Sequence, residues 1–110
     1  MRIISGKLKG KPISFLKNLN TRPLKDSVKE SIFNIIIHSN SLDIEIKDSN
    51  ILDLYSGVGS FGLECISRGA NKVTFIEQNK LACETLKKNL DQLSLNNKAT
   101  LINDNVENIF

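Results

Sequence analysis

The second half of the chain alternates short apolar runs with amphipathic segments. Residues 51–55, 73–76 and 99–103 are apolar runs of the length typical of buried strands. Residues 60–68 and 80–93, which lie between these runs, carry apolar side chains at helical spacing. Strands that alternate with helices form right-handed βαβ units, and such units build a parallel sheet. The pattern therefore predicts an α/β fold.

Local signals set the ends of these elements. Gly69 follows the first helix at the position where a left-handed residue is favoured, and Asn79 can cap the second helix. Asp104 follows the third strand and begins what we expect to be another helix, which runs to Phe110. The side chains of the second helix that we expect to face inward are Leu86, Leu90 and Leu93.

The first half of the chain predicts a hairpin followed by a helix. Residues 2–5 and 11–15 have the pattern of short strands on either side of a turn rich in glycine and lysine. A helix begins at Asp26 or Ser27 and ends near His38. Its apolar positions at helical spacing, which we expect to face inward, are Val28, Ile32, Ile35 and Ile36.

The composition is that of a folded globular chain. It has 110 residues, 40% of them hydrophobic and 25% charged, which excludes a disordered tail. No apolar run reaches the roughly 18 residues of a transmembrane helix, and the start lacks the apolar stretch of a signal peptide, so we expect a cytoplasmic protein. We divide the chain into an extension over residues 1–40 and the beginning of a sheet domain over residues 41–110, and we expect a monomer.

The sequence shows no pattern of a metal site. Cys65 and Cys83 lie far apart with no Cys-x-x-Cys pair, which argues against a disulfide scaffold or a zinc site. His38 is the single histidine, and at the end of a predicted helix it suits the helix dipole better than a ligand or base role.

The positive charge is concentrated near the N-terminus. Residues 1–30 contain eight basic and two acidic side chains, whereas the other 80 residues contain seven basic and ten acidic ones. A basic segment joined to a mildly acidic body is typical of a protein that binds a polyanion, with nucleic acid as the first choice. The alternative is a solvated lysine-rich hairpin without a partner.

A glycine loop stands between the first predicted strand and the helix after it. Gly57, Gly59 and Gly62 fit the pattern G-x-G-x-x-G in the strand–loop–helix context that this pattern requires. We expect Gly57 to allow a tight turn, Gly59 to let the backbone approach a ligand, and Gly62 to bring the helix close to the strand. Glu77 follows Gly57 by 20 residues, where a carboxylate can accept both hydroxyl protons of a ribose. These features indicate a nucleoside-cofactor site; the alternative is a structural turn with a surface glutamate.

Two further acids affect the choice between NAD and S-adenosylmethionine. Asp53 lies four residues before Gly57, where it would repel a pyrophosphate but attract the ammonium and sulfonium of a methionine end. Asp104 follows the third strand, where a carboxylate can accept a hydrogen bond from an adenine amine. The competing interpretations are structural: Asp53 would bind loop amides, and Asp104 would form a capping box with Glu107.

The order of Asp53, Gly57, Gly59, Glu77 and Asp104 resembles that in class I S-adenosylmethionine-dependent methyltransferases. A closer resemblance is to the bacterial 16S rRNA guanine-N2 methyltransferases of the RsmD family, and it covers nearly the whole chain. The segments that carry it are RIISGK at 2–7, KGK at 9–11, TRP at 21–23, LDLYSGVGSFGLE at 52–64 and SRGA at 67–70, with Asp26, Val28, Lys29, Glu30, Phe33 and Asn34 in the predicted helix.

This resemblance implies a Rossmann-like fold, of which the chain holds the first three strands after a basic hairpin and helix. It implies that S-adenosylmethionine is the cofactor and that a guanine N2 amine in 16S rRNA of the small ribosomal subunit is the methyl acceptor. The residues assigned to the cofactor are Asp53, Tyr55, Gly57, Gly59, Glu77, Gln78, Asp104 and Asn105. The residues assigned to RNA are Lys7, Lys9, Lys11, Thr21, Arg22, Lys25 and Lys29.

One part of the family pattern is missing. Such enzymes carry an Asn/Asp-Pro-Pro-Tyr/Phe loop after a fourth strand, which orients the target amine and stacks on the flipped base. Pro12 and Pro23 are the only prolines and neither adjoins another, so we expect no catalytic residue in this chain and place the catalytic loop downstream of Phe110. We interpret the chain as a truncated member whose first strand has a bare edge. The alternatives are an inactive cofactor- or RNA-binding fragment, another class I RNA or DNA methyltransferase, and an NAD-dependent oxidoreductase.

Overall fold

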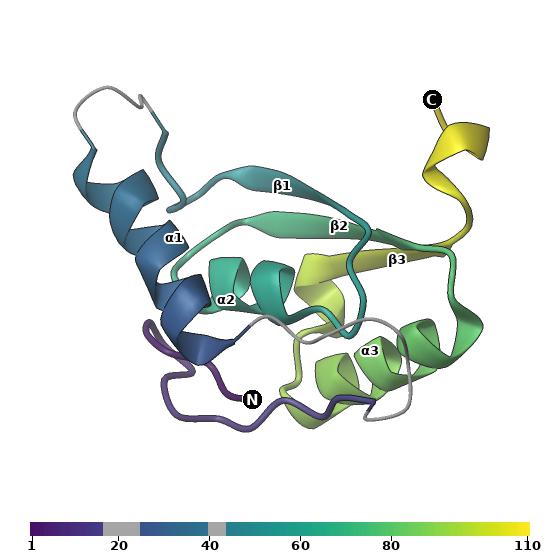
Figure 1. Cartoon of the computed structure of the whole chain (residues 1–110), viewed down its shortest axis with the longest axis horizontal. Coiled ribbons are helices and arrows are strands. Elements are labelled where there is room, and N and C mark those ends of the chain that lie inside the picture. The colour runs from purple at the N-terminus through teal and green to yellow at the C-terminus, as the bar shows by residue number, and fades with distance from the viewer. Residues whose placement is uncertain (17–24, 40–43) are drawn as a thin grey trace.

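The strands form the predicted parallel sheet. The computed structural model describes residues 1–16, 25–39 and 44–110 (Figure 1). Its three parallel strands lie in the order β1-β2-β3, with bounds β1 (Asn50–Leu54), β2 (Lys72–Glu77) and β3 (Ala99–Asn103). The register pairs Leu54 with Ile76 and Glu77 with Asn103, so the carboxyl ends of the strands meet at one edge of the sheet. The α/β prediction is confirmed.

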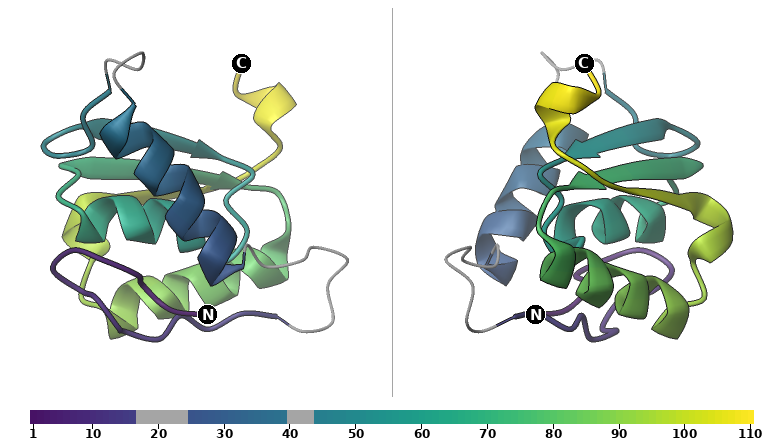
Figure 2. Two further views of the ribbon diagram at one scale, coloured as in Figure 1. Left: turned by 60° about the vertical axis from the view of Figure 1, so that its left-hand side comes forward. Right: turned by 90° about the vertical axis from the view of Figure 1, so that its right-hand side faces the viewer.

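The helices lie close to their predicted positions. They are α1 (Asp26–His38), α2 (Ser60–Ser67) and α3 (Lys80–Gln92), with a 3-10 turn η1 (Asn96–Lys98) before β3. Both α2 and α3 lie on the same side of the sheet, as right-handed crossovers require (Figures 1 and 2). Asn79 caps α3 as predicted, because its side-chain oxygen accepts from the Ala82 amide at 2.9 Å. Among the described residues, no helix has the length and apolarity needed to cross a membrane.

The segment after β3 differs from the prediction. In place of an α-helix from Asp104 to Phe110, it forms a 3-10 turn, η2 (Val106–Asn108), whose cap is Asn105. The Asn105 side-chain oxygen accepts from the Glu107 amide at 3.0 Å. The cap is therefore Asn105, a residue type that caps helices as well as aspartate does, and the Asp104–Glu107 capping box of the alternative interpretation does not form. Phe110 follows this turn, and its amide donates to the Val106 carbonyl at 3.2 Å.

The predicted hairpin forms a turn without regular strands. Its arms meet at one isolated antiparallel bridge between Arg2 and Pro12. Around this bridge the Ile3 amide donates to the Lys11 carbonyl at 2.9 Å, and the Ile13 amide donates to the Met1 carbonyl at 3.0 Å. The turn packs on α2, where Gly6 has φ +85° and lies so close to Ser67 that a Cβ would overlap the Ser67 carbonyl. The surface of α2 therefore determines the path of this segment.

The N-terminal extension and the sheet share one apolar core. The buried cluster joins Ile3, Ile13 and Phe33 of the extension to residues of the sheet and its helices, among them Leu63, Val73, Phe75, Leu86 and Leu90. The Phe33 ring stacks on Phe61 of α2 with 5.0 Å between ring centroids. Leu93 is only partly buried against this cluster. The predicted boundary at residues 40–41 lies outside the described residues.

The inward face of α1 differs from the predicted stripe. The buried residues of the helix are Lys29 and Phe33, whereas Val28 and Ile35 are 45% and 60% exposed. Ile32 and Ile36 are partly buried. The helix is rotated from the expected orientation because Lys29 pairs with the buried Glu64 carboxylate of α2. Phe33, one turn further along α1, stacks on Phe61 of the same α2.

Within the described ranges, the side of the sheet away from α2 and α3 is uncovered at β1. Leu52 and Leu54 are 49% and 39% exposed. In the described part of the chain, β1 pairs with β2 and with no other strand. The expected bare edge is present there.

Candidate nucleoside-cofactor site

The glycine loop begins where β1 ends. Tyr55 has φ 58° and Gly57 also has φ 58°, so the chain leaves the extended conformation directly after Leu54. The Ser56 amide donates to the Ile76 carbonyl at 3.0 Å, and the Ser56 hydroxyl accepts from the Ile76 amide at 3.1 Å. These bonds hold the loop against the end of β2, and they leave Tyr55 68% exposed.

The three glycines of the loop have different surroundings. A Cβ on Gly62 would overlap the Phe75 ring, which confirms the predicted close packing of helix on strand. A Cβ on Gly59 would overlap Leu86 of α3, so this glycine is close-packed on the side that faces α3. The predicted approach of its backbone to a ligand stays a prediction. A Cβ on Gly57 would meet no atom of residues 1–16, 25–39 or 44–110 within 4 Å. The space beside the backbone is therefore at Gly57, at the carboxyl edge of the sheet.

Glu77 binds the loop from the end of β2. Its Oε1 accepts from the Gly57 amide at 2.8 Å, and its Oε2 accepts from the Asn79 amide at 2.9 Å. Asn103 at the end of β3 donates to the carbonyls of Glu77 and Gln78, at 2.9 Å and 3.2 Å. The sheet thus brings the glycine loop, Glu77 and Gln78 together, with the end of β3 alongside.

Asp53 is a buried acid with an unpaired oxygen. The residue is 8% exposed, and its Oδ2 has no hydrogen-bond partner among the residues that the structure describes. Burial raises the pKa of Asp53 to about 6 and the charge of Glu77 adds to the rise, whereas the neighbouring Gly62 amide and Ser56 hydroxyl oppose it. A buried carboxylate without a counter-charge is costly unless it binds a cation or a proton.

Asp104 and Asn105 form the turn beyond β3. Asp104 Oδ1 accepts from the Asn108 side chain at 2.9 Å and from the Asn105 amide at 2.7 Å. These two bonds hold the pKa of Asp104 below its ordinary value. Because the strands are parallel, both residues follow the same edge of the sheet as Asp53 and Glu77.

Phe110 marks the position beyond which we expected the catalytic loop. Its side chain is 73% exposed, and its one backbone bond joins it to Val106 in the turn after β3. Phe110 is therefore held to the turn that precedes it by its own backbone amide. The location of the catalytic loop downstream of Phe110 stays a prediction.

The basic residues assigned to RNA separate into exposed and buried ones. Lys7, Lys9, Lys11 and Lys25 are exposed, and Thr21 and Arg22 lie outside the described residues. Lys29 is fully buried, contrary to the expectation of an RNA contact. In this fold the Lys29 ammonium cannot reach a phosphate at the surface.

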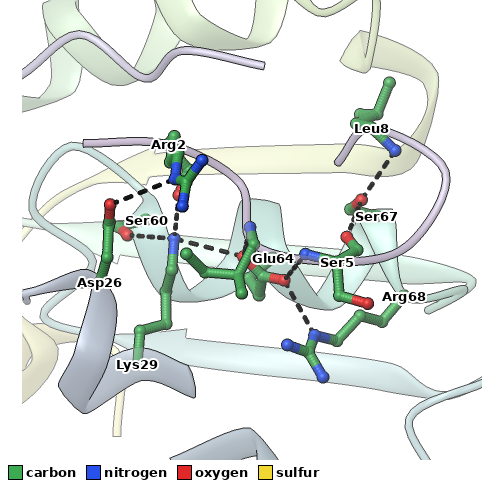
Figure 3. Close-up of polar contacts among 10 residues, drawn as sticks. Arg2, Ser5, Leu8, Asp26, Lys29, Ser60, Glu64, Ser67 and Arg68 are labelled. Carbon is green, nitrogen blue, oxygen red and sulfur yellow. Dashed lines mark hydrogen bonds and ion pairs between the residues drawn. The ribbon is translucent and has the colours of Figure 1, made fainter. Parts of the chain in front are cut away.

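Lys29 belongs to a buried polar cluster (Figure 3). Its Nζ donates to the Arg2 carbonyl at 2.7 Å and to the Ser60 hydroxyl at 3.1 Å, and it lies 3.2 Å from Oε1 of Glu64. Arg68 Nε donates to the other Glu64 oxygen at 2.8 Å, and its guanidinium lies over the Phe33 ring. The spacing of Glu64 and Arg68 is visible in the sequence as an i, i+4 pair, whereas nothing there marks Lys29 as their partner.

The Glu64 carboxylate also binds the N-terminal segment. It accepts from the Ile4 amide at 2.8 Å and from the Ser5 amide at 3.0 Å. Burial alone would raise the pKa of Glu64, but the Ile4, Arg68 and Ser5 hydrogen bonds and the Lys29 charge together lower it. Glu64 is therefore ionised and fully paired inside the protein. Across the described ranges, no group of three or more His, Cys, Asp and Glu side chains could hold a metal ion.

Replacement of Lys29 tests this cluster. Lys29→Met keeps the volume but leaves the buried Glu64 charge with one cation fewer, so we expect the free energy of unfolding to fall by about 3 kcal/mol. Lys25→Met, at an exposed lysine just before the same helix, should change it by less than about 0.5 kcal/mol. Urea unfolding followed by circular dichroism measures both values, and equal effects of the two variants would contradict this account.

Replacement of Asp53 tests its raised pKa. The folded protein binds the Asp53 proton more tightly than the unfolded chain, so this group's contribution to stability is full at low pH and is lost as pH rises through about 6. Asp53→Asn should therefore increase the free energy of unfolding by about 2 kcal/mol at pH 8 and by less than about 1 kcal/mol at pH 4.

Urea titrations of Asp53→Asn at both pH values give the comparison. Glu84→Gln removes an exposed charge from α3 and serves as the control, with no gain expected at either pH. A loss of stability at pH 8 in Asp53→Asn would show that the buried charge is not the dominant effect.

Comparison with known proteins identifies the family. The chain matches the family model described as Conserved hypothetical protein 95 over residues 1–110. It is 39% identical to the Ribosomal RNA small subunit methyltransferase D of Haemophilus influenzae over 104 residues, which cover 94% of this chain and 51% of that protein. The chain spans about half the length of the curated relatives it matches.

Solved structures agree with this result. The structure described as "Putative methyltransferase yhhF from Escherichia coli" is 31% identical, with a TM-score of 0.80 over 99% of this chain and 55% of that one. A crystal structure described as PRMT6-SAH is 26% identical, with a TM-score of 0.60 over 73% of this chain and 22% of that one. With the parallel sheet, the glycine loop and a family model that matches every residue, the chain belongs to the RsmD family of methyltransferases and has their Rossmann-like class I fold.

Proposed function

We propose that this chain binds S-adenosylmethionine at the carboxyl edge of its sheet, as the cofactor-binding part of an enzyme that methylates a guanine N2 amine in 16S rRNA. The observation that supports this most directly is Asp53, beside the glycine loop, whose buried Oδ2 has no partner in the described part of the chain. When bound, the cofactor supplies a methyl group activated by a positively charged sulfur.

Asp53 would hold the methionine end of the cofactor. That end carries an ammonium and a sulfonium, and either charge would compensate the buried carboxylate. A pyrophosphate would add negative charge next to Asp53, which argues against NAD at this edge. Open space beside Gly57 and the exposed Tyr55 leave room for the ligand along the loop.

Glu77 and the residues after it would hold the nucleoside. Each Glu77 oxygen accepts one backbone amide, which leaves lone pairs on both oxygens for the two ribose hydroxyls. Gln78 is exposed next to it. Asp104 and Asn105, at the end of the third strand, would bind the adenine, although their side chains at present bind their own turn.

The exposed lysines of the N-terminal turn would bind the RNA backbone. Lys7, Lys9 and Lys11 gather on one exposed turn, and Lys25 is exposed at the start of α1. Lysines in this arrangement attract phosphates without reading sequence. The proposed substrate is the 16S rRNA of the small subunit, because a relative is named a ribosomal RNA small subunit methyltransferase. We also expect the protein to be a cytoplasmic monomer.

Methyl transfer to an amine would need positioning more than covalent chemistry. The guanine amine would have to lie in line with the methyl group, and this chain contains no Pro-Pro segment to orient it. We therefore assign cofactor binding to the 110 residues and no catalytic residue up to Phe110.

Cofactor binding is tested by calorimetry with S-adenosylhomocysteine, the demethylated product. Glu77→Ala removes both proposed ribose bonds, so we expect binding to weaken by roughly 1–3 kcal/mol. Glu84→Ala, an exposed glutamate of α3, should bind as the wild type does. Binding of NADH in place of S-adenosylhomocysteine by the wild-type chain would overturn the choice of cofactor.

RNA binding is tested by charge reversal. The triple variant of Lys7, Lys9 and Lys11 to Glu should bind a 16S rRNA transcript more weakly and with a smaller salt dependence, because fewer counterions are released. The matched control reverses three exposed lysines of α3, which are Lys80, Lys87 and Lys88. Filter binding at several salt concentrations measures the RNA affinity of both variants. An equal loss of affinity in the control would show that only the net charge of the protein matters.

A further inference from the structure

One buried side chain joins the N-terminal extension to the glycine loop. Asn89 of α3 is 1% exposed. Its Oδ1 accepts from the Ser14 amide at 2.9 Å, and its Nδ2 donates to the Ser14 carbonyl at 3.0 Å and to the Val58 carbonyl at 3.0 Å. Val58 lies between the first two glycines of the loop. Both donors and the acceptor of the amide are therefore used in holding these two segments together.

A second contact joins the same two segments. Lys29 Nζ donates to the Arg2 carbonyl at 2.7 Å and to the hydroxyl of Ser60, the residue directly after Gly59, at 3.1 Å (Figure 3). Both bonds are made by an ammonium that is fully buried. The loop is thus held at Val58 and at Ser60, two residues apart.

These two contacts lie at the two ends of the N-terminal turn that carries Lys7, Lys9 and Lys11, which we call the basic turn. Arg2 precedes the turn and Ser14 follows it, so Lys7, Lys9 and Lys11 lie on the chain between the two contacts. The middle of the turn is also fixed to α2, because the Leu8 amide donates to the Ser67 hydroxyl at 2.9 Å and the Lys7 amide to the Ser67 carbonyl at 2.8 Å. A shift of the glycine loop would therefore displace one or both ends of the basic turn.

We propose that Asn89 and Lys29 are positioning residues that couple the basic turn to the glycine loop, so that a nucleoside cofactor bound at the loop strengthens RNA binding at the turn. This inference rests on the proposed function, since it assumes both ligands. A ligand that fixes the loop also fixes Val58 and Ser60, and through them the ends of the turn, so the second ligand loses less conformational freedom when it binds. The coupling is reciprocal, as thermodynamic linkage requires.

The experiment measures RNA affinity with and without the cofactor product. Filter binding of the full 110-residue chain to a 16S rRNA transcript is carried out in the absence and in the presence of saturating S-adenosylhomocysteine. We expect the product to tighten RNA binding by about fivefold or more in the wild type. In Asn89→Leu, which keeps the volume and removes all three hydrogen bonds, this factor should fall towards one.

A second variant keeps the test valid if Asn89→Leu does not fold. Ser60→Ala removes only the hydroxyl that accepts from Lys29 and leaves the Lys29–Glu64 pair in place, and it should also reduce the factor. The control is Gln92→Leu, which removes an exposed amide from the same helix as Asn89 and should keep the wild-type factor.

The outcomes separate this inference from the proposed function. Wild-type chain that binds both ligands without mutual effect would overturn the coupling and leave the cofactor assignment in place. A wild-type factor that persists in both Asn89→Leu and Ser60→Ala would show that these contacts do not carry it. Wild-type chain that binds no S-adenosylhomocysteine in calorimetry would overturn the proposed function, and the coupling with it.

Discussion

The Glu64 carboxylate is the interaction on which the arrangement of the molecule depends. It lies inside the protein, where an unpaired charge would be costly, and it is satisfied by donors from three separate parts of the chain. The Ile4 and Ser5 amides come from the N-terminal segment, Lys29 comes from α1, and Arg68 directly follows α2. Removing any donor would leave a buried acceptor under-satisfied, so the carboxylate fixes where each of these parts can lie.

The candidate site depends on that arrangement because α2 joins the glycine loop to the residues around Glu64. The first turn of α2 follows the glycine loop. Glu64 and Ser67 lie further along the helix and Arg68 directly follows it, and the N-terminal extension packs against these three residues. The loop itself is held by the ends of β1 and β2. A basic turn and a nucleoside site that are far apart in sequence therefore have a common structural support.

The sequence predicts those features of the structure that depend on residues close together along the chain. The three strands, the Asn79 cap and the close packing at Gly62 follow from apolar runs, cap residues and glycine spacing. The sequence does not predict the position of a side chain when that position depends on a partner distant in sequence. Lys29 was grouped with the exposed lysines because its partner is 35 residues away, and the same pairing rotates α1 so that Ile35 faces outward. The close packing of Gly59 against Leu86 of the next helix is a further contact that no local pattern reveals.

Glu77 has a consequence for the thermodynamics of ligand binding. Its two oxygens hold the amides of Gly57 and Asn79, so the backbone on both sides of the strand end is already fixed before any ligand arrives. The conformational entropy of ordering the backbone at Gly57 and Asn79 is therefore lost during folding and not during association. A ligand at this edge has to order only the remainder of the loop, so its affinity is reduced by that smaller cost alone.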